Sequence, residues 1–194
     1  MSACPPESKA LIDRILGGDR KAFKTLVEDH QRLVSHVVFR MIANRQDRED
    51  VCQDVFMKVY RNLGRFRHES RLSTWIARIA HNACLTHLEA KRIPVADEDI
   101  LDYERPDTTG PEGIAPDRLF ESRDLAERIQ TEIDSLPLNF RTALTLFHLD
   151  NMNYAEIADI MKMPENTIKS HLFRGRRMLK ERLSARYGVE DLWR

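Results

Sequence analysis

Apolar residues recur at intervals of three and four along most of this 194-residue chain, and this spacing constrains the fold more than any other feature. Val51, Val55 and Val59, for example, would form one row along a helix. Glycine is scarce, with 7 residues, and residues that favour helices are abundant. We therefore predict an all-α fold with enough apolar side chains to build a core.

Four helices with short connections are predicted over residues 1–93, which would form a compact bundle. Each is expected to begin at a side chain that can accept a hydrogen bond from the first free backbone amides. The predicted N-cap residues are Ser8, Asp19, Asp47 and either Ser73 or Thr74.

The segment 94–117 has a different composition, with four prolines and two glycines. Between residues 96 and 117, eight acidic residues accompany one basic residue. Such a segment is typical of a linker without fixed structure. We predict two small helical domains, residues 1–93 and 118–194, joined by this acidic flexible linker.

The second domain is predicted to end in a helix-turn-helix. Asn153 is suited to cap a helix over 154–162, and Glu156 stands where a capping box requires it. Pro164 then separates this helix from a final one. Two helices joined by so short a turn resemble a DNA-binding helix-turn-helix.

The final helix has an apolar side and a basic side. Ile168, Leu172, Gly175 and Leu179 would face the preceding helix. A basic, partly apolar outward side suits the major groove of DNA, although an ordinary helical hairpin with a basic surface is the alternative. An outward-facing phenylalanine argues against that alternative. The candidate DNA-binding residues on the outward side are Lys169, Ser170, Phe173, Arg174 and Arg177.

No metal site, cofactor site or catalytic centre is predicted. His81, Cys84 and His87 follow one another at intervals of three residues, so their side chains spread around a helix instead of converging on one point, and a fourth ligand is not evident. We expect a buried cysteine and two histidines on the polar side. A glycine-rich phosphate loop and a nucleophile constellation are also missing from the sequence, so an enzyme is disfavoured.

The sequence predicts a cytoplasmic protein without membrane insertion. Its first residues, MSACPPESK, lack the apolar centre of a signal peptide, and no apolar run is long enough to span a bilayer. The three cysteines are odd in number and widely spaced, so no disulfide framework is indicated.

The whole chain resembles an extracytoplasmic-function (ECF) sigma factor of the sigma-70 family. DREDVCQDVFMKVYRNLGRF and STWIARIAHN resemble sigma region 2, and YAEIADIM followed by TIKSHLFRGRR resembles sigma region 4. The resemblance implies a transcription initiation subunit that binds core RNA polymerase at its β′ clamp helices and β flap. It also implies recognition of −35 and −10 promoter DNA, and inhibition by an anti-sigma factor.

The resemblance assigns the third predicted helix to the polymerase. The family places the clamp helices against this surface, whereas plain solvent exposure is the alternative for charged residues on a helix. The candidate polymerase-binding residues are Asp50, Gln53, Asp54, Phe56 and Lys58.

The loop before the fourth helix and the helix itself are assigned to the −10 element. Asn82 matches the family asparagine that lines a pocket for a flipped base, and Phe66 would offer an aromatic surface for stacking. Trp75 is either a core residue or a DNA contact. The candidate −10 residues are Phe66, His68, Ser70, Arg71, Trp75, Arg78 and Asn82.

The sequence leaves three points open. Lys162 stands at the helix-turn-helix bend where the family often has glycine, and a left-handed backbone there would strain a lysine by about 1 kcal/mol. The alternative function is a stand-alone helix-turn-helix transcription regulator, which would bind specific duplex DNA without polymerase. The acidic linker either lies along the polymerase or serves as a soluble tether.

Overall fold

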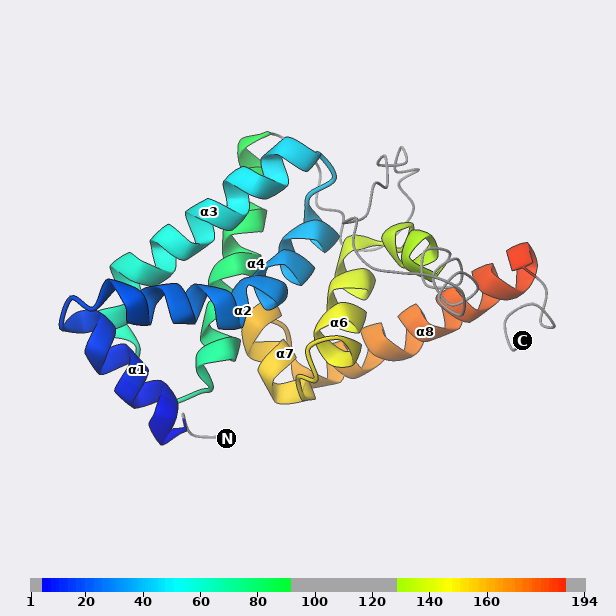
Figure 1. The fold of residues 1–194 in the computed structure, drawn as a ribbon. Helices are drawn as coiled ribbons and strands as arrows, with labels where there is room; N and C mark the ends of the chain where they lie inside the picture. The colour runs from blue at the N-terminus through cyan, green and yellow to red at the C-terminus, as the bar shows by residue number, and fades with distance from the viewer. Residues whose placement is uncertain (1–4, 92–128, 188–194) are drawn as a thin grey trace, which may run out of the picture.

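The computed structural model describes residues 5–91 and 129–187, and every regular element in these two stretches is helical (Figure 1). The predicted all-α fold is confirmed. The predicted linker, residues 94–117, lies outside the described residues, so its flexibility and the exact domain boundaries stay predictions.

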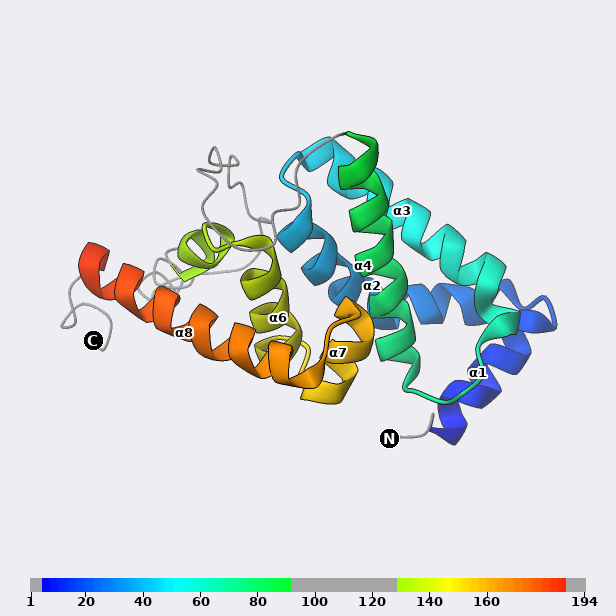
Figure 2. The ribbon, with the colours of Figure 1, turned by 180° about the vertical axis from the view of Figure 1, so that it is seen from behind.

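The first group of helices forms the bundle that the sequence predicts. Helices α2, α3 and α4 pack on one another, and α1 lies against the beginning of α2 (Figures 1 and 2). Val55, Val59 and Ile76 are fully buried between them. The elements are α1 (Pro6–Leu16), α2 (Arg20–Met41), α3 (Arg45–Asn62), a 3₁₀ turn (Leu63–Arg65) and α4 (Leu72–Ala90).

The second group contains the helix-turn-helix. A helical stretch over residues 129–134 precedes α6 (Leu138–His148), α7 (Tyr154–Met161) and α8 (Glu165–Tyr187). Helix α8 packs on both α6 and α7, and its far end extends away from the first group of helices (Figure 2).

Two of the predicted caps are confirmed. The Asp19 carboxylate accepts hydrogen bonds from the amides of Lys21 and Ala22 at the start of α2. Asn153 and Glu156 form the capping box of α7, each side chain accepting from the other residue's backbone amide.

Three predicted caps are wrong by a few residues. Helix α1 begins at Pro6, ahead of Ser8, because proline is already set for the first helical turn. Helix α3 is capped by Asn44, whose side chain accepts from the Asp47 amide, so Asp47 lies inside the first turn. Helix α4 begins at Leu72, which is buried, and Ser73 and Thr74 follow inside the helix.

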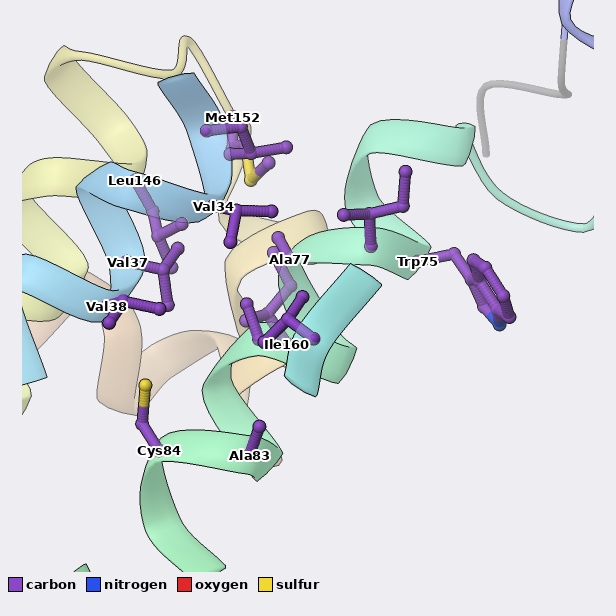
Figure 3. Packing of buried hydrophobic residues seen from close by; sticks show 14 of the residues in the cluster. Val34, Val37, Val38, Trp75, Ala77, Ala83, Cys84, Leu146, Met152 and Ile160 are labelled. Carbon is purple, nitrogen blue, oxygen red and sulfur yellow. The ribbon is translucent and has the colours of Figure 1, made fainter. Parts of the chain in front are cut away.

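The two groups of helices share one apolar core, which the sequence did not predict. Helix α2 packs on α6, and α4 packs on α7. Figure 3 shows Val34 and Val37 of α2 beside Leu146 of α6, with Met152 close by.

Among the described residues, no helix is both long and apolar enough to cross a membrane.

His81 of α4 is a core residue rather than a histidine on the polar side. Its side chain is 5% exposed, and burial lowers the pKa of its imidazole to about 4. Cys84, one turn further along, is fully buried, and burial raises the pKa of its thiol to about 12. The prediction of a buried cysteine is confirmed, and that of a surface His81 is wrong.

The backbone at the helix-turn-helix bend is left-handed at Lys162, which is the strained conformation considered in the sequence analysis. Lys162 follows α7 with φ 55° and ψ 41°, which is the left-handed region that favours glycine. The Lys162 amide still donates to the carbonyl of Ala158 and closes the helix.

Replacing Lys162 with glycine is expected to stabilise the protein by about 1 kcal/mol, because glycine has no Cβ to clash in this conformation. Urea unfolding at neutral pH measures the change. Lys162→Ala is the matched control, since it removes the charge but keeps the Cβ. Equal stabilities of the glycine and alanine variants would contradict this account of the bend.

Lowering the pH from 7 to about 4 is expected to destabilise the protein through His81. The unfolded chain takes up a proton on this ring below its ordinary pKa of 6.5, whereas the native ring stays neutral down to about pH 4. The free energy of unfolding should therefore fall across this window by about 2–3 kcal/mol. Urea unfolding at several pH values measures the slope. In His81→Met the slope should be shallower; the same slope in both proteins would show that this ring is not responsible.

Candidate nucleic-acid and polymerase interfaces

The outward face of α8 has the geometry that the sequence predicts. Ile168 and Leu172 are buried against α6 and α7, while all five candidate residues point into solvent, Phe173 with 68% of its surface exposed. Lys169 pairs with Glu165 at 3.0 Å on the same helix. Exposed pairs of this kind are weak, so the lysine remains able to bind a phosphate. We define the outward face of α8 as Lys169, Ser170, Phe173, Arg174 and Arg177.

Gly175 fixes how closely α8 approaches α6. A Cβ at this position would lie 3.1 Å from Leu144 Cδ1, which is tighter than ordinary side-chain contacts, and 3.4 Å from Phe140 Cβ, which is an ordinary contact. The absence of a side chain at Gly175 therefore lets α8 pack closely on α6. This close packing sets the position of the outward face of α8.

A stack of aromatic rings beside α8 was missed by the sequence analysis. The rings of Phe147 and Tyr154 are parallel at 5.4 Å, with Lys169 over one and Arg176 over the other. Arg176 Nε also donates to His148 Nε2 at 3.2 Å, and burial together with this arginine lowers the pKa of His148. Arg176 is therefore a further basic residue near the turn. In the sequence, only its place within RGRR, residues 174–177, indicates this.

Two of the candidate −10 residues belong to the core. Phe66 is 7% exposed, and its ring packs against those of His68 at 4.8 Å and Trp75 at 5.2 Å. Trp75 is itself 9% exposed. The Phe66 ring is not available for stacking in this conformation, because it leaves water by packing on its neighbours; its assignment to the −10 element stays a prediction. The alternative that Trp75 is a core residue is the one observed.

The remaining −10 candidates lie on the loop before α4 and along the first half and middle of this helix. His68 has a left-handed backbone with φ 58°, and Ser70 Oγ donates to the carbonyl of Arg71. Asn82 is half-buried on α4. Arg78 Nη1 donates to both carboxylate oxygens of Asp159 at 2.9 and 3.0 Å, so the structure brings this arginine against α7.

The candidate polymerase surface on α3 is largely exposed. Asp50, Gln53 and Asp54 point into solvent, and Lys58 pairs with Asp54 at 2.6 Å; Phe56 is half-buried. Met57 and Tyr60 lie exposed on the same helix. The sequence indicates Tyr60, which flanks the candidate residues together with Phe56, whereas Met57 was missed. Large apolar side chains beside exposed charges are typical of a protein-binding surface.

The histidines and cysteines of α4 do not gather into a metal site. His87 Nε2 lies 3.3 Å from Asp47 Oδ2, whereas Cys84 is fully buried in the core. The pKa of Asp47 is held below its usual value, chiefly by the hydrogen bond from Lys91 and then by His87. In the part of the chain that the structure describes, no three His, Cys, Asp or Glu side chains converge on one point.

Comparison with protein families adds an independent finding. The family model described as Sigma-70 region 2 matches residues 26–93, and the one described as Sigma-70, region 4 matches residues 126–179. The first match contains α3, α4 and most of α2, and the second contains α6, α7 and the larger part of α8.

Similar proteins carry related names. The chain is 37% identical over 179 residues to the ECF RNA polymerase sigma-E factor of Escherichia coli, covering 90% of this chain and 93% of that protein. It is 32% identical over 181 residues to the RNA polymerase sigma-H factor of Pseudomonas aeruginosa, covering 91% and 94%.

Two solved structures share the fold. The sigma factor RpoE in complex with the anti-sigma factor NepR, from Bartonella quintana, aligns with a TM-score of 0.66 and 22% identity, covering 86% of this chain and 99% of that one. CnrH in complex with the cytosolic domain of CnrY aligns with a TM-score of 0.64 and 19% identity, covering 91% and 97%.

Proposed function

Because the chain belongs to the ECF sigma factors of the sigma-70 family, we propose that it joins core RNA polymerase and directs it to promoters. The observation that carries this proposal is that one chain matches both conserved regions along most of its length, like relatives named RNA polymerase sigma factors. Such a role needs binding surfaces and no chemistry of its own. We infer that the protein acts in the cytoplasm and is not an enzyme.

The outward face of α8 is assigned to duplex DNA of the −35 element. Lys169, Arg174 and Arg177 can neutralise phosphates or bind guanine edges, and Phe173 can contact a thymine methyl group. The exposure of Phe173 supports this assignment, since water is an unfavourable environment for its ring. The β flap of the polymerase is the expected protein partner of this group of helices.

Helix α4 is assigned to the −10 element. Asn82 has both a hydrogen-bond donor and an acceptor, as recognition of a flipped base edge requires. Arg78 and Arg71 would hold the adjacent phosphates. Since Phe66 is buried, stacking on this ring requires a rearrangement of the loop, and the base-edge contact of Asn82 is the stronger expectation.

The exposed face of α3 is assigned to the β′ clamp helices. Asp50, Gln53 and Asp54 would pair with basic residues of the polymerase. Met57 and Tyr60 would be covered in the complex, which accounts for their exposure in the free chain.

An anti-sigma factor is the proposed regulatory partner. One of the similar solved structures is a sigma factor in complex with an anti-sigma factor, RpoE with NepR. A protein that covers the α3 and α8 surfaces together would block polymerase and promoter at once. We propose functional regions at residues 1–93 and 118–194, with the acidic segment 94–117 between them.

Transcription in vitro tests the proposal. The chain is mixed with core RNA polymerase and a library of double-stranded templates that are randomised in the −35 and −10 windows, and the templates that yield RNA are sequenced. Arg174→Ala is expected to lower initiation about tenfold and to relax preference in the −35 window, because one base or phosphate contact is lost. Asn82→Ala is expected to relax preference in the −10 window instead.

Lys24→Ala is the matched control, since it removes an exposed charge from α2. It should leave both preferences unchanged. Initiation that needs no added chain, or identical preferences in all variants, would overturn the proposal. Tight binding of the free chain to one duplex sequence without polymerase would favour the stand-alone regulator.

A further inference from the structure

Two side chains at the end of α6 hold Arg176 of α8, and they do so without a carboxylate. We propose that Phe147 and His148 are positioning residues, which hold the Arg176 guanidinium at the edge of the outward face of α8 to bind a backbone phosphate of promoter DNA. Helix α6 would then contribute to promoter affinity although it carries none of the candidate DNA-binding residues. The identity of the phosphate rests on the proposed function, whereas the contacts that hold Arg176 do not.

The ring of Phe147 supports the guanidinium from one side. Arg176 Cζ lies 5.0 Å from the centre of this ring, which is within the range of a cation–π contact. Tyr154, the first residue of α7, stacks on the other side of the contact with its ring centre 5.4 Å from that of Phe147. The guanidinium therefore lies on a ring whose orientation two helices determine.

His148 sets the direction of the arginine. Arg176 Nε donates to His148 Nε2 at 3.2 Å, so this ring nitrogen carries no proton. Burial and the nearby Arg176 charge lower the pKa of His148 below its ordinary value of 6.5, and the ring is therefore neutral at neutral pH. Among the described residues, none bonds to the two terminal nitrogens of Arg176. These two nitrogens are the pair that a bidentate phosphate contact uses.

The charge of Arg176 is less compensated than the charges of its neighbours on α8. Lys169 pairs with Glu165 at 3.0 Å. Arg177 pairs with Glu181 at 3.6 Å. No carboxylate in the described part of the chain pairs with Arg176. A cation that is held only by a ring face and a neutral nitrogen keeps its attraction for an anion from outside.

Arg176 lies where the backbone of a bound duplex would pass. It follows Lys169 by seven residues, or about two turns, so the two side chains share one side of α8. Lys169 Nζ lies 5.7 Å from the centre of the Tyr154 ring, so both cations lie against the same pair of stacked rings. In a helix-turn-helix the second helix enters the major groove while the first crosses the backbone. The stacked rings join these helices, and a backbone phosphate is therefore the anion expected there.

The salt dependence of DNA binding tests the contact of Arg176. Holoenzyme assembled from the full chain and core RNA polymerase is titrated onto a dye-labelled promoter duplex at several salt concentrations. Each phosphate contact contributes about 0.9 to the slope of log affinity against log salt, so Arg176→Ala is expected to make the slope shallower by about 1. Its preference in the −35 window should be unchanged, because a phosphate carries no base identity. Lys24→Ala is again the control and should leave the slope unchanged.

Exchanges at Phe147 test whether the ring positions the arginine. Phe147→Leu keeps an apolar side chain but removes the ring face, and it is expected to make the slope shallower by less than Arg176→Ala does. Phe147→Trp keeps a ring face and should restore the slope. Phe140→Leu is the matched control, since it makes the same exchange on α6 beside Gly175 and away from Arg176. An equal effect of both leucine exchanges would show that damage to the packing of α6, and not the support of Arg176, is responsible.

Exchanges at His148 test the hydrogen bond. His148→Gln is expected to keep the slope, because its amide oxygen can accept from Arg176 Nε, whereas His148→Ala should make the slope shallower. Equal slopes in the glutamine and alanine variants would contradict a positioning role for His148.

Combination with Arg176→Ala separates positioning from a general loss of stability. If Phe147 and His148 act through the arginine, Phe147→Leu and His148→Ala should have no further effect on the slope once Arg176 is alanine. Additive effects would overturn the positioning role, and an unchanged slope in Arg176→Ala would overturn the phosphate contact. Circular dichroism of each free chain checks that the helices are intact.

Association with core RNA polymerase distinguishes the phosphate from an acidic partner. Weaker association of Arg176→Ala with an unchanged salt slope would overturn the phosphate contact and assign Arg176 to a carboxylate of the polymerase. If no holoenzyme bound the duplex in any form, the proposed function would fail and the phosphate contact with it. Holoenzyme that binds with one slope in all variants would overturn the phosphate contact alone.

Discussion

Helix α2 must bury apolar side chains on more than one side at once, and the arrangement of the whole molecule depends on this constraint. Its buried residues Leu26, Val34, Val37 and Val38 lie among α1, α3, α4 and α6. A helix that is half-solvated needs one apolar stripe, whereas α2 has a wider one. The second group of helices covers the apolar surface of α2 that the first group leaves uncovered. Both groups therefore pack on a single core.

This sharing gives one polypeptide two opposed requirements. The proposed promoter binding would need α4 and α8 to act at separate places, whereas apolar burial favours keeping them together. Polar groups at the contact reduce the conflict. Arg40 and its partners satisfy one another when covered and are readily hydrated when not, so the same residues suit both arrangements.

Local patterns made much of the architecture predictable. The period of apolar residues identified the helices, and Asn153 with Glu156 marked the start of α7. The outward face of α8 followed from the phase of Ile168 and Leu172, because a single helix fixes which residues share a side. Where several good capping residues stood close together, as with Asn44 and Asp47, sequence alone could not choose between them.

Contacts between distant residues were not predictable in this way. Arg78 and Asp159 are 81 positions apart, and nothing in the local sequence of either identifies the other. Phe66 looked like an isolated ring in a polar loop, and only its packing on Trp75 shows that it is covered. His81 was placed on the wrong side for the same reason, since periodicity does not reveal how many sides of α4 are enclosed.

The packing of α8 on α6 and α7 leaves its outward side free to change in sequence. The helix packs on its neighbours through Gly175, Ile168 and Leu172. None of these residues belongs to the side that would meet DNA. Mutations on that side can therefore accumulate with little effect on folding. A new target sequence could be acquired by a few exchanges there, while the scaffold that carries them stays as it is.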